Sequence, residues 1–327
     1  MKRQVNRVGY WASLSVAAIA LLVASALPAV AWEPKKPVEF VIMAGQGGGA
    51  DRLARLIQGI IQKNSYSPQP FIPINKGGGS GAEALRYLKD KAGDPHVIMA
   101  TLNSYYTTPL RTDIGVDISD MTPVARLAED TFLLWVHTDT GITSLDQYVS
   151  AVKAQGNRWV MGGTGKGQED SLVTGMLESE FGVKMTYVPF SGGGTVAKNL
   201  VGKHINSSVN NPSEALGFMQ AGSVKPLVAF TPERLAVFPD VPTARELGHD
   251  LVYFMQRSVV APPKVAQDVV DFYVGVFDKV NKSKDWVDYT DSKALNRAFL
   301  TGKDLQSYFL AEREKHRTLL RSLGEIN

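Results

Sequence analysis

The stretch VEFVIMAGQGGGADRLARLIQGIIQK, residues 38–63, decides the class of fold. It begins with an apolar run, passes through three consecutive glycines, and ends in a segment whose Leu53, Ile57, Ile60 and Ile61 recur at helical spacing. An apolar face of that period, with arginine and glutamine on the other side, is typical of an amphipathic helix. The stretch therefore predicts a strand, a glycine-rich loop and a helix over residues 50–63.

The same order recurs along the chain, where short apolar runs alternate with amphipathic segments. Such alternation is typical of an α/β fold with largely parallel sheets. Strands are expected at 38–43, 71–74, 97–101, 132–136, 159–161, 185–188, 226–230 and 251–261. Further helices are expected at 145–155, 170–181, 195–201, 265–282 and 304–323.

The N-terminus has the order of a secretory signal peptide. Lys2, Arg3 and Arg7 precede an apolar run, which ends in Ala29-Val30-Ala31 immediately before Trp32. The run is shorter than the roughly 18–20 residues that cross a bilayer, and the small residues form a cleavage site. We expect residues 1–31 to be removed after Ala31, which places the mature protein in the periplasm.

Charge and cysteine content narrow the function classes. The sequence has 35 Lys and Arg against 32 Asp and Glu, and the three basic residues in the signal peptide account for the surplus. A balanced mature chain does not indicate a nucleic-acid partner. The absence of cysteine excludes disulfides, thiol catalysis and a lipid-acceptor cysteine. The five histidines form no close pair, so neither a metal site nor a cofactor is expected.

Four glycine-dense segments follow predicted strands, at 47–49, 77–79, 162–167 and 192–194. In an open α/β sheet such loops lie at the carboxyl ends of strands, where ligand crevices form. Glycine lets backbone N–H groups approach a ligand, and the helix that follows adds unpaired donors and a positive dipole end. The segments therefore predict an anion site, although each glycine run taken alone also suits a tight turn.

Two nucleotide motifs are only partly matched. Residues 45–50 fit the loose dinucleotide fingerprint, but no Asp or Glu lies between Asp51 and Glu83 to hold a ribose. Gly165-Lys166 resembles a phosphate loop, yet Val160 and Gly167 stand where glycine and Ser/Thr belong. Ser80 likewise misses the nucleophile-elbow pattern of hydrolases at Ala82.

The chain resembles the tripartite tricarboxylate transporter receptors, also called Bug proteins. The resemblance rests on the signal peptide and on four motifs in order: AGQGGGAD, NKGGGSGAEAL, VPFSGGGTVAKNLVGKHI and FPDVPTARELG, at residues 44–51, 75–85, 188–205 and 238–248. It implies a two-lobed Venus-flytrap fold with two crossing strands. Lobe one would hold residues 32–132 and 254–327, lobe two residues 133–253, and the hinge would lie near 132–136 and 251–261.

The resemblance also implies the ligand-binding residues, because receptors of this family hold carboxylates through backbone amides of the facing lobes. On lobe one these would be Gly47, Gly48, Gly49, Ala50, Asp51, Thr101 and Asn103. On lobe two they would be Gly163, Thr164, Gln168, Gly192, Gly193, Gly194, and Asn210 or Asn211. Arg257 is a further candidate for binding the ligand because of its own position in an apolar strand.

Several of these side chains have a second interpretation. Asp51 begins a helix and suits the helix dipole as well as a ligand. Arg257 lies in an apolar strand, where it would face either a ligand carboxylate or a structural acid. Tyr105, Tyr106 and Phe190 would line the pocket or pack in a core.

Two departures from the family pattern concern the ligand. The first loop opens with Ala44-Gly45-Gln46 where prolines are usual, and the middle loop carries Lys166, Gln168, Glu169 and Asp170. Glu169 and Asp170 would repel a second carboxylate if they lined the cleft, or would simply stabilise a helix start. Lys166 would instead attract such a group.

The expected function is a monomeric extracytoplasmic receptor, without enzymatic activity, for a small di- or tricarboxylate or aromatic acid. Its partners would be the integral-membrane subunits of a transporter. A receptor that reports to a signalling partner remains an alternative, and so does a periplasmic enzyme that acts on a carboxylated metabolite.

Overall fold

The computed structural model of the protein describes residues 31–327, and residues 33–327 form one compact unit. The expected signal peptide lies, apart from Ala31, outside the described residues. Within the described part of the chain, no helix combines the length and the apolar character needed to cross a membrane.

A six-stranded sheet is built from both ends of the chain, in the order β11-β4-β10-β3-β1-β2. Strand β1 pairs in parallel with β2 and β3, while β10 runs antiparallel to β3 and β4, and β11 runs antiparallel to β4. The strands are β1 (Val38–Ile42), β2 (Phe71–Asn75), β3 (Val97–Thr101), β4 (Thr122–Thr131), β10 (Phe254–Ala261) and β11 (Asn296–Thr301).

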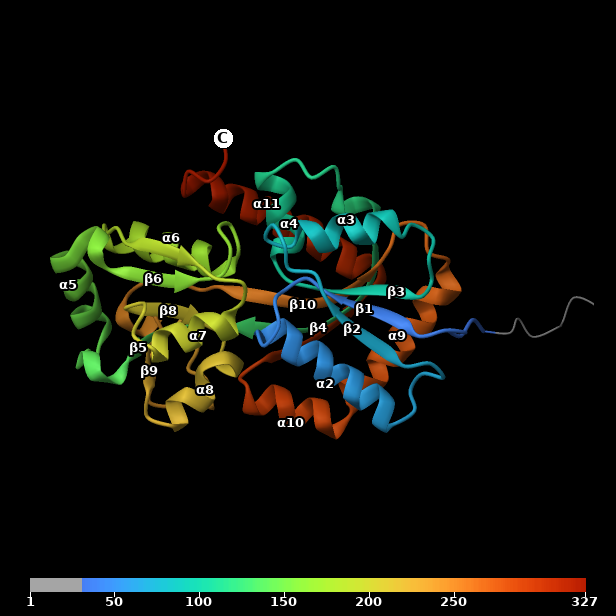
Figure 1. The fold of residues 1–327 in the computed structure, drawn as a ribbon, viewed down its shortest axis with the longest axis horizontal. Helices are drawn as coiled ribbons and strands as arrows, with labels where there is room; N and C mark the ends of the chain where they lie inside the picture. Colours follow the sequence, from blue (N-terminus) through green and yellow to red (C-terminus); the bar gives the residue numbers. More distant parts are fainter. Residues whose placement is uncertain (1–30) are drawn as a thin grey trace, which may run out of the picture. The chain divides into compact units, whose positions relative to one another are not determined.

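Helices cover both faces of this sheet (Figure 1). On one face α2 packs with α9 and α10, and on the other α4 packs with α3 and α11. The helices are α2 (Gly49–Lys63), α3 (Ala82–Asp90), α4 (Ser104–Arg111), α9 (Gln267–Lys282), α10 (Lys284–Ser292) and α11 (Gly302–Ser322).

Helix α2 confirms the helix predicted over residues 50–63. Leu53, Ile57, Ile60 and Ile61 are buried, whereas Arg52 is exposed. The apolar stripe therefore holds α2 against the sheet, and its N-terminus is left at the carboxyl end of β1, beside the first glycine loop.

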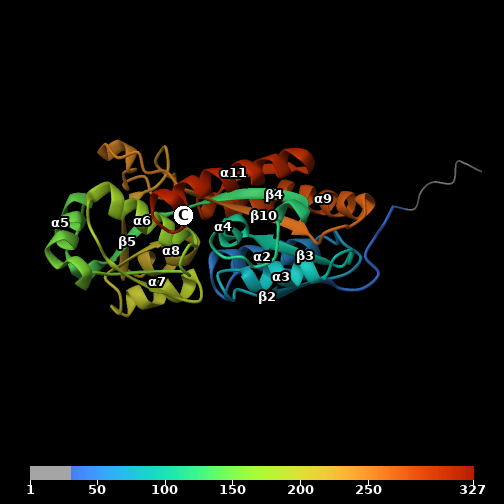
Figure 2. The same ribbon diagram turned by 90° about the horizontal axis from the view of Figure 1, so that it is seen from above.

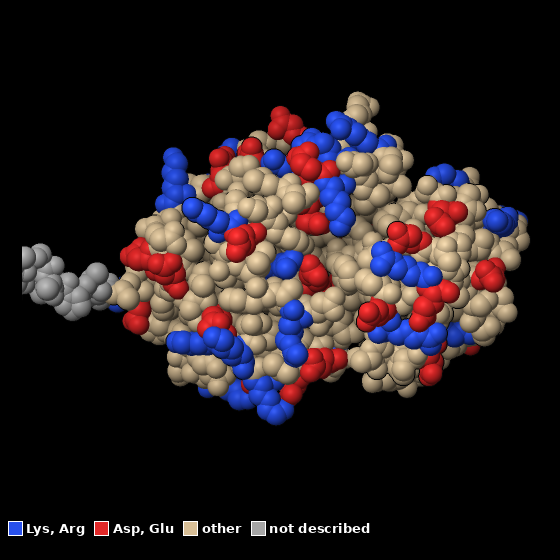
Figure 3. Space-filling model, turned by 180° about the vertical axis from the view of Figure 1, so that it is seen from behind, with Lys and Arg blue, Asp and Glu red and all other residues tan. Residues whose placement is uncertain are grey.

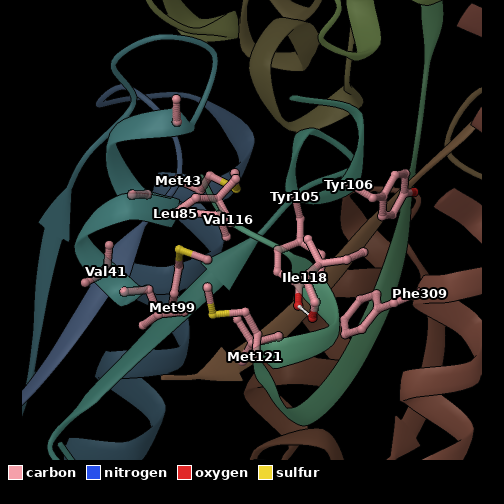
Figure 4. Close-up of a cluster of buried hydrophobic side chains, with 14 of the residues drawn as sticks. Val41, Met43, Leu85, Met99, Tyr105, Tyr106, Val116, Ile118, Met121 and Phe309 are labelled. Atoms are coloured by element: carbon pink, nitrogen blue, oxygen red, sulfur yellow. Dashed lines mark hydrogen bonds between the residues drawn. The ribbon is translucent and has the colours of Figure 1, made fainter. Parts of the chain in front are cut away.

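The core on the opposite face is formed by side chains from β1, β3, α3, α4 and α11 (Figure 4). Tyr105 packs against Phe309 with ring centroids 4.9 Å apart, and its hydroxyl donates to the carbonyl of Ile118 at 3.1 Å. Because its one polar atom is paired inside the core, the position of α4 is fixed, and with it the position of the helix N-terminus at Ser104.

A five-stranded sheet is built from the middle of the chain, in the order β7-β6-β8-β5-β9. Helix α6 covers one face, and α7 and α8 cover the other, over the core that contains Trp135 and Leu200. The elements are β5 (Leu133–His137), α5 (Leu145–Gln155), β6 (Val160–Gly163), α6 (Glu169–Phe181), β7 (Thr186–Pro189), α7 (Gly193–Val201), β8 (Ser207–Asn210), α8 (Pro212–Gln220) and β9 (Val224–Ala229).

The chain crosses between the sheets at two neighbouring segments. Strand β4 becomes β5 at Phe132, and the chain returns through Tyr253 into β10. Phe230 connects them, because its N–H donates to the carbonyl of Phe132 at 3.0 Å and its carbonyl accepts the N–H of Tyr253 at 3.0 Å. Figure 2 shows α11 running along β4, beside this crossing.

The α/β class is confirmed, but the expectation of mostly parallel sheets is wrong. In the described residues, two of five pairings are parallel in the first sheet and two of four in the second. Every antiparallel pairing involves β4, β5 or β10, the strands that flank a crossing. A strand that enters a sheet directly from the other half arrives without the crossover helix that would make it parallel to its neighbour. The expected lobe bounds stay a prediction, because residues 33–327 also form one compact unit.

Charged side chains are mixed by sign on the face of the molecule drawn in Figure 3, where Lys and Arg lie among Asp and Glu. The described residues include exposed ion pairs such as Lys63 with Asp285 and Arg245 with Asp250. Exposed pairs of this kind contribute little to stability. The fold is therefore held mainly by its buried cores.

Candidate functional site

A small cavity lies between the two sheets, at the carboxyl ends of their parallel strands. Its volume is about 40 Å³, whereas pockets for small molecules usually measure roughly 300 Å³ or more. The cavity is therefore smaller than a typical small-molecule pocket. The lining residues are Ala44, Gly45, Gly48, Gly49, Ala50, Gly77, Leu102, Thr164, Gln168, Glu169, Asp170, Ser191, Gly192, Gly193, Asn211, Glu214, Met255 and Arg257.

Two glycine loops meet across this cavity. A Cβ added to Gly45 would lie 2.2 Å from the carbonyl oxygen of Ser191, and one added to Gly194 would lie 2.4 Å from the oxygen of Gly47. Real Cβ atoms do not approach oxygen so closely, so both positions require glycine in this closed arrangement. The N-termini of α2 and α7, one from each sheet, are thereby brought face to face, and a helix N-terminus favours negative charge.

Glu214 supplies a negative charge at this point from inside the protein. Its Oε1 accepts the N–H of Gly49, at the start of α2, at 2.8 Å. Its Oε2 accepts from Nδ2 of Asn210 at 2.9 Å and from the N–H of Asn211 at 3.2 Å. One carboxylate thus caps its own helix α8 and also binds across the cavity to the other half.

Glu169 and Asp170, at the start of α6, form a second acidic wall. Oε1 of Glu169 accepts the N–H of Ser104 at the start of α4 at 3.0 Å, and Oδ2 of Asp170 accepts the N–H of Thr164 at 2.9 Å. Burial raises the pKa of Glu169, and burial together with the nearby carboxylates Glu214 and Glu169 raises the pKa of Asp170 well above its usual value. Both acids therefore hold protons more tightly than exposed carboxyl groups do.

Arg257 is the one basic side chain among the described residues that line the cavity. Its Nε donates to Oδ2 of Asp130 at 3.0 Å, Nη2 also binds that oxygen, and Nη2 donates to Oδ1 of Asn211 at 3.2 Å. Both charged side chains are 2% exposed. The guanidinium is therefore held by a structural acid, the second of the two interpretations that the sequence left open, while its edge still borders the cavity.

Residues 53–324 match the family described as the tripartite tricarboxylate transporter family receptor. The match spans most of the chain. The chain belongs to this receptor family.

Relatives and solved structures agree with this assignment. The receptor is 26% identical over 319 residues to the "UPF0065 protein in gbd 5'region" of Cupriavidus necator, with 94% of each chain covered. It shares its fold with the periplasmic binding protein BugD, at a TM-score of 0.84 and 19% identity, over 90% of this chain and 99% of BugD. It also matches MatC from Rhodopseudomonas palustris with bound malate, at a TM-score of 0.81 and 24% identity, over 88% and 99% of the two chains. These likenesses confirm the two-lobed binding-protein fold.

Nine of the sixteen binding residues predicted for the receptor line the cavity. They come from the loops before α2, α6, α7 and α8 and from β10, so segments far apart in sequence do converge. The nine are Gly48, Gly49, Ala50, Thr164, Gln168, Gly192, Gly193, Asn211 and Arg257. Whether they bind ligand stays a prediction.

The other seven are not among the residues that line the cavity. Asp51 shapes the first loop, because Oδ2 accepts the N–H of Gly47 at 2.9 Å and Oδ1 accepts from Arg55 and Asn75. Asn210 positions Glu214, while Gly163 packs against Tyr187 and Gly194 packs against Gly47. Thr101 and Asn103 instead join β3 and the start of α4 to β10: Thr101 Oγ1 donates to the carbonyl of Ser258, and Asn103 Oδ1 accepts the N–H of Gln256.

The three aromatic residues that were expected in the pocket or in a core pack in the cores. Tyr105 and Tyr106 are fully buried in the core of the first sheet (Figure 4), and neither lines the cavity. Phe190 is partly buried against the core of the second sheet. Lys166 points to the outer surface, where its carbonyl accepts from Arg111 and Ser80, so it does not line the cavity.

Sequence reasoning missed Glu214 altogether and left Glu169 and Asp170 undecided. A signal for Glu214 is present in Asn211-Pro212-Ser213-Glu214, because Asn followed by Pro at the first helical position and Glu at the third is typical of a helix start. That pattern predicts a capping glutamate but not its contact with Gly49. Glu169 and Asp170 turn out to fulfil both expectations, since they begin α6 and also line the cavity.

Within residues 31–327, no group of three or more His, Asp or Glu side chains is arranged to hold a metal ion. The chemistry that the cavity offers is recognition by backbone amides, carboxylates and one guanidinium.

Proposed function

We propose that this protein is an extracytoplasmic receptor that captures a small carboxylate, a di- or tricarboxylate or an aromatic acid, in the cleft between its sheets. It would deliver the ligand to the membrane subunits of a tripartite tricarboxylate-type transporter. In this proposal the signal peptide is cleaved after Ala31, the mature protein is a periplasmic monomer, and it binds its ligand without altering it.

The observation that carries the proposal is the convergence of the α2 and α7 N-termini with Arg257 on one cavity. The first N–H groups of a helix have no partner within the helix, and they favour an anion together with the helix dipole. Ala50 in the first turn of α2 lines the cavity, as does Gly193 in the first turn of α7. A ligand carboxylate placed between them would bind both halves and hold them closed.

Release would require the halves to separate, and the crossing offers a place for that motion. Only the segments at Phe132 and Tyr253 continue from one sheet to the other within residues 33–327, and Phe230 bonds to both. Small changes of backbone angle at such strand ends produce domain closure in two-lobed binding proteins. MatC, which shares this fold, was solved with malate.

The test is a thermal-shift screen of the chain from Trp32 after unfolding and refolding to remove any bound ligand. A ligand that binds only the folded state raises the free energy of unfolding by mass action, by about 2.7 kcal/mol at a concentration of 100 Kd. The melting temperature rises accordingly. We expect a selective, saturable shift with one class of carboxylate. A refolded, monomeric protein that shifts with no mono-, di- or tricarboxylate or aromatic acid would contradict the proposed ligand class.

A further inference from the structure

The charge of the cavity lining does not suit a ligand that carries only negative groups. Glu169, Asp170 and Glu214 line it, and none of the three forms an ion pair with a basic side chain of the described residues. The positive charge of Arg257 is already balanced by Asp130. A dianion would therefore enter a buried space that already holds an excess of acidic groups, at a large electrostatic cost.

The protein also uses its own carboxylates at two of the backbone donors expected to bind a ligand carboxylate. The N–H of Gly49 is bound to Glu214, and the N–H of Thr164 is bound to Asp170. A carboxylate oxygen has further acceptor capacity after one such bond. The wall at Thr164 and Asp170 therefore presents acceptors to the cavity, and acceptors of this kind suit a ligand with N–H or ammonium donors.

The opposite wall has a different character. A methyl group on Gly49 would lie 2.6 Å from Nη2 of Arg257 and 3.4 Å from Oγ of Ser213. The Ser213 side chain is 5% exposed, and its Oγ has no hydrogen-bond partner in the described structure. Ser213 does not line the cavity, so the donors that this wall presents to a ligand are the edge of Arg257 and the start of α2.

We propose that the ligand is a zwitterion, with an ammonium group facing Glu169 and Asp170 and a carboxylate facing Arg257 and the start of α2. This inference rests on the proposed receptor function and narrows its ligand class to amino acids and related amines. The ammonium supplies the positive charge that Glu169 and Asp170 do not receive from a basic side chain of the described residues, and the carboxylate meets the donors at the other end.

Matched pairs of ligands test the inference directly. Glutarate and 5-aminopentanoate have the same number of carbon atoms, as do adipate and 6-aminohexanoate, and in each pair an aminomethyl group, CH2–NH3+, replaces one carboxylate. Isothermal titration with the refolded chain from Trp32 measures the Kd of each ligand. In the pair that binds more tightly, the Kd of the amino acid should be lower than that of the dicarboxylate by roughly tenfold or more.

The E169Q/D170N double variant identifies the residues responsible. Gln and Asn keep an oxygen that can accept from Ser104 and Thr164, so the fold should remain intact, which circular dichroism checks. We expect the double variant to lose the preference for the amino acid and to bind the dicarboxylate more tightly than the unaltered chain does. The control is D146N, which removes an exposed acid in the first turn of α5 and should leave the preference unchanged.

The outcomes separate this inference from the function on which it rests. Tighter binding of the dicarboxylate by the unaltered chain, or an amino-acid preference that survives E169Q/D170N, would overturn the zwitterion and leave the carboxylate receptor standing. Failure of every carboxylate and every amino acid to bind the folded chain would overturn both.

Discussion

At the scale of single residues, the buried acids decide most of the chemistry. Sequence alone predicted the charged groups of the middle loop but could not choose a role for them, because that depends on what the loop faces after folding. Glu169 meets the start of α4, which lies 65 residues away in sequence, and Glu214 meets Gly49 at a separation of 165 residues. Contacts of this range leave no trace in local periodicity.

Removal of one buried acid should stabilise the protein. Because burial raises the folded-state pKa of Asp170 well above its unfolded value, its contribution is favourable at low pH and is lost as the pH rises towards the folded pKa. D170N should therefore raise the free energy of unfolding at pH 7 and reduce its decline between about pH 4 and pH 7. Urea denaturation at a series of pH values measures both effects, and an unchanged pH profile would contradict this account of Asp170.

Removal of the acid from the buried ion pair between Asp130 and Arg257 should instead destabilise the protein. D130N leaves the guanidinium of Arg257 buried without a counter-charge, and breaking a buried pair typically costs about 3 to 5 kcal/mol. Urea denaturation at neutral pH should show this loss of stability. Isothermal titration should show weaker ligand binding. The D130L/R257M double variant, which removes both charges, should recover most of the stability but not the binding.

At the scale of elements, the sequence predicted those whose pattern is regular. Helix α2 and strands β1 and β3 have clear apolar periodicity, whereas β4 and β8 do not. Strand β4 carries Pro123, Arg126, Glu129 and Asp130, yet it lies inside the sheet between β10 and β11, because its charged side chains find partners there. The polar strand β8 is buried since Ser207 bonds to Tyr148 and Trp159.

Closure of the glycine loops offers a test at this scale. G45A would place a methyl group against the carbonyl of Ser191, which belongs to the other half, so we expect a receptor that folds but does not close. With a saturating concentration of ligand, small-angle scattering should find a larger radius of gyration for G45A than for the unaltered receptor. The affinity of G45A for the ligand should be lower by roughly tenfold or more. The control is G217A in α8, where an added methyl meets nothing within 4 Å. That substitution should raise stability by about 0.5 to 1 kcal/mol without affecting closure.

At the scale of the whole molecule, the two sheets and their connection were predicted more completely than the site between them. Glycine loops at strand ends and helix starts are local features, so nine predicted residues do converge on the cavity. The burial of Thr101 and Asn103, which do not line the cavity, depends instead on how β10 returns from the second sheet, because their partners are Ser258 and Gln256. The sequence could not supply that register.

His316 connects α11 to this returning segment and should make the whole fold sensitive to acid. Its Nε2 lies 3.1 Å from the hydroxyl of Tyr253 and 3.4 Å from Nδ2 of Asn103, and its Nδ1 lies 2.8 Å from the carbonyl of Glu312. Burial lowers its pKa to about 4, although the carbonyl of Glu312 opposes that shift and Lys315 adds to it. The imidazole is therefore neutral at pH 7.

Because the folded pKa of His316 lies below the unfolded value of about 6.5, the folded state binds fewer protons. Stability should fall by up to about 3 kcal/mol as the pH drops from about 6.5 to about 4. H316Q removes the titrating group and should flatten this acid decline, while D170N should leave it in place because Asp170 acts with the opposite sign. Melting temperatures measured across this pH range test the account. If they fall equally with acid in H316Q and in the unaltered chain, the acid sensitivity comes from other groups and not from His316.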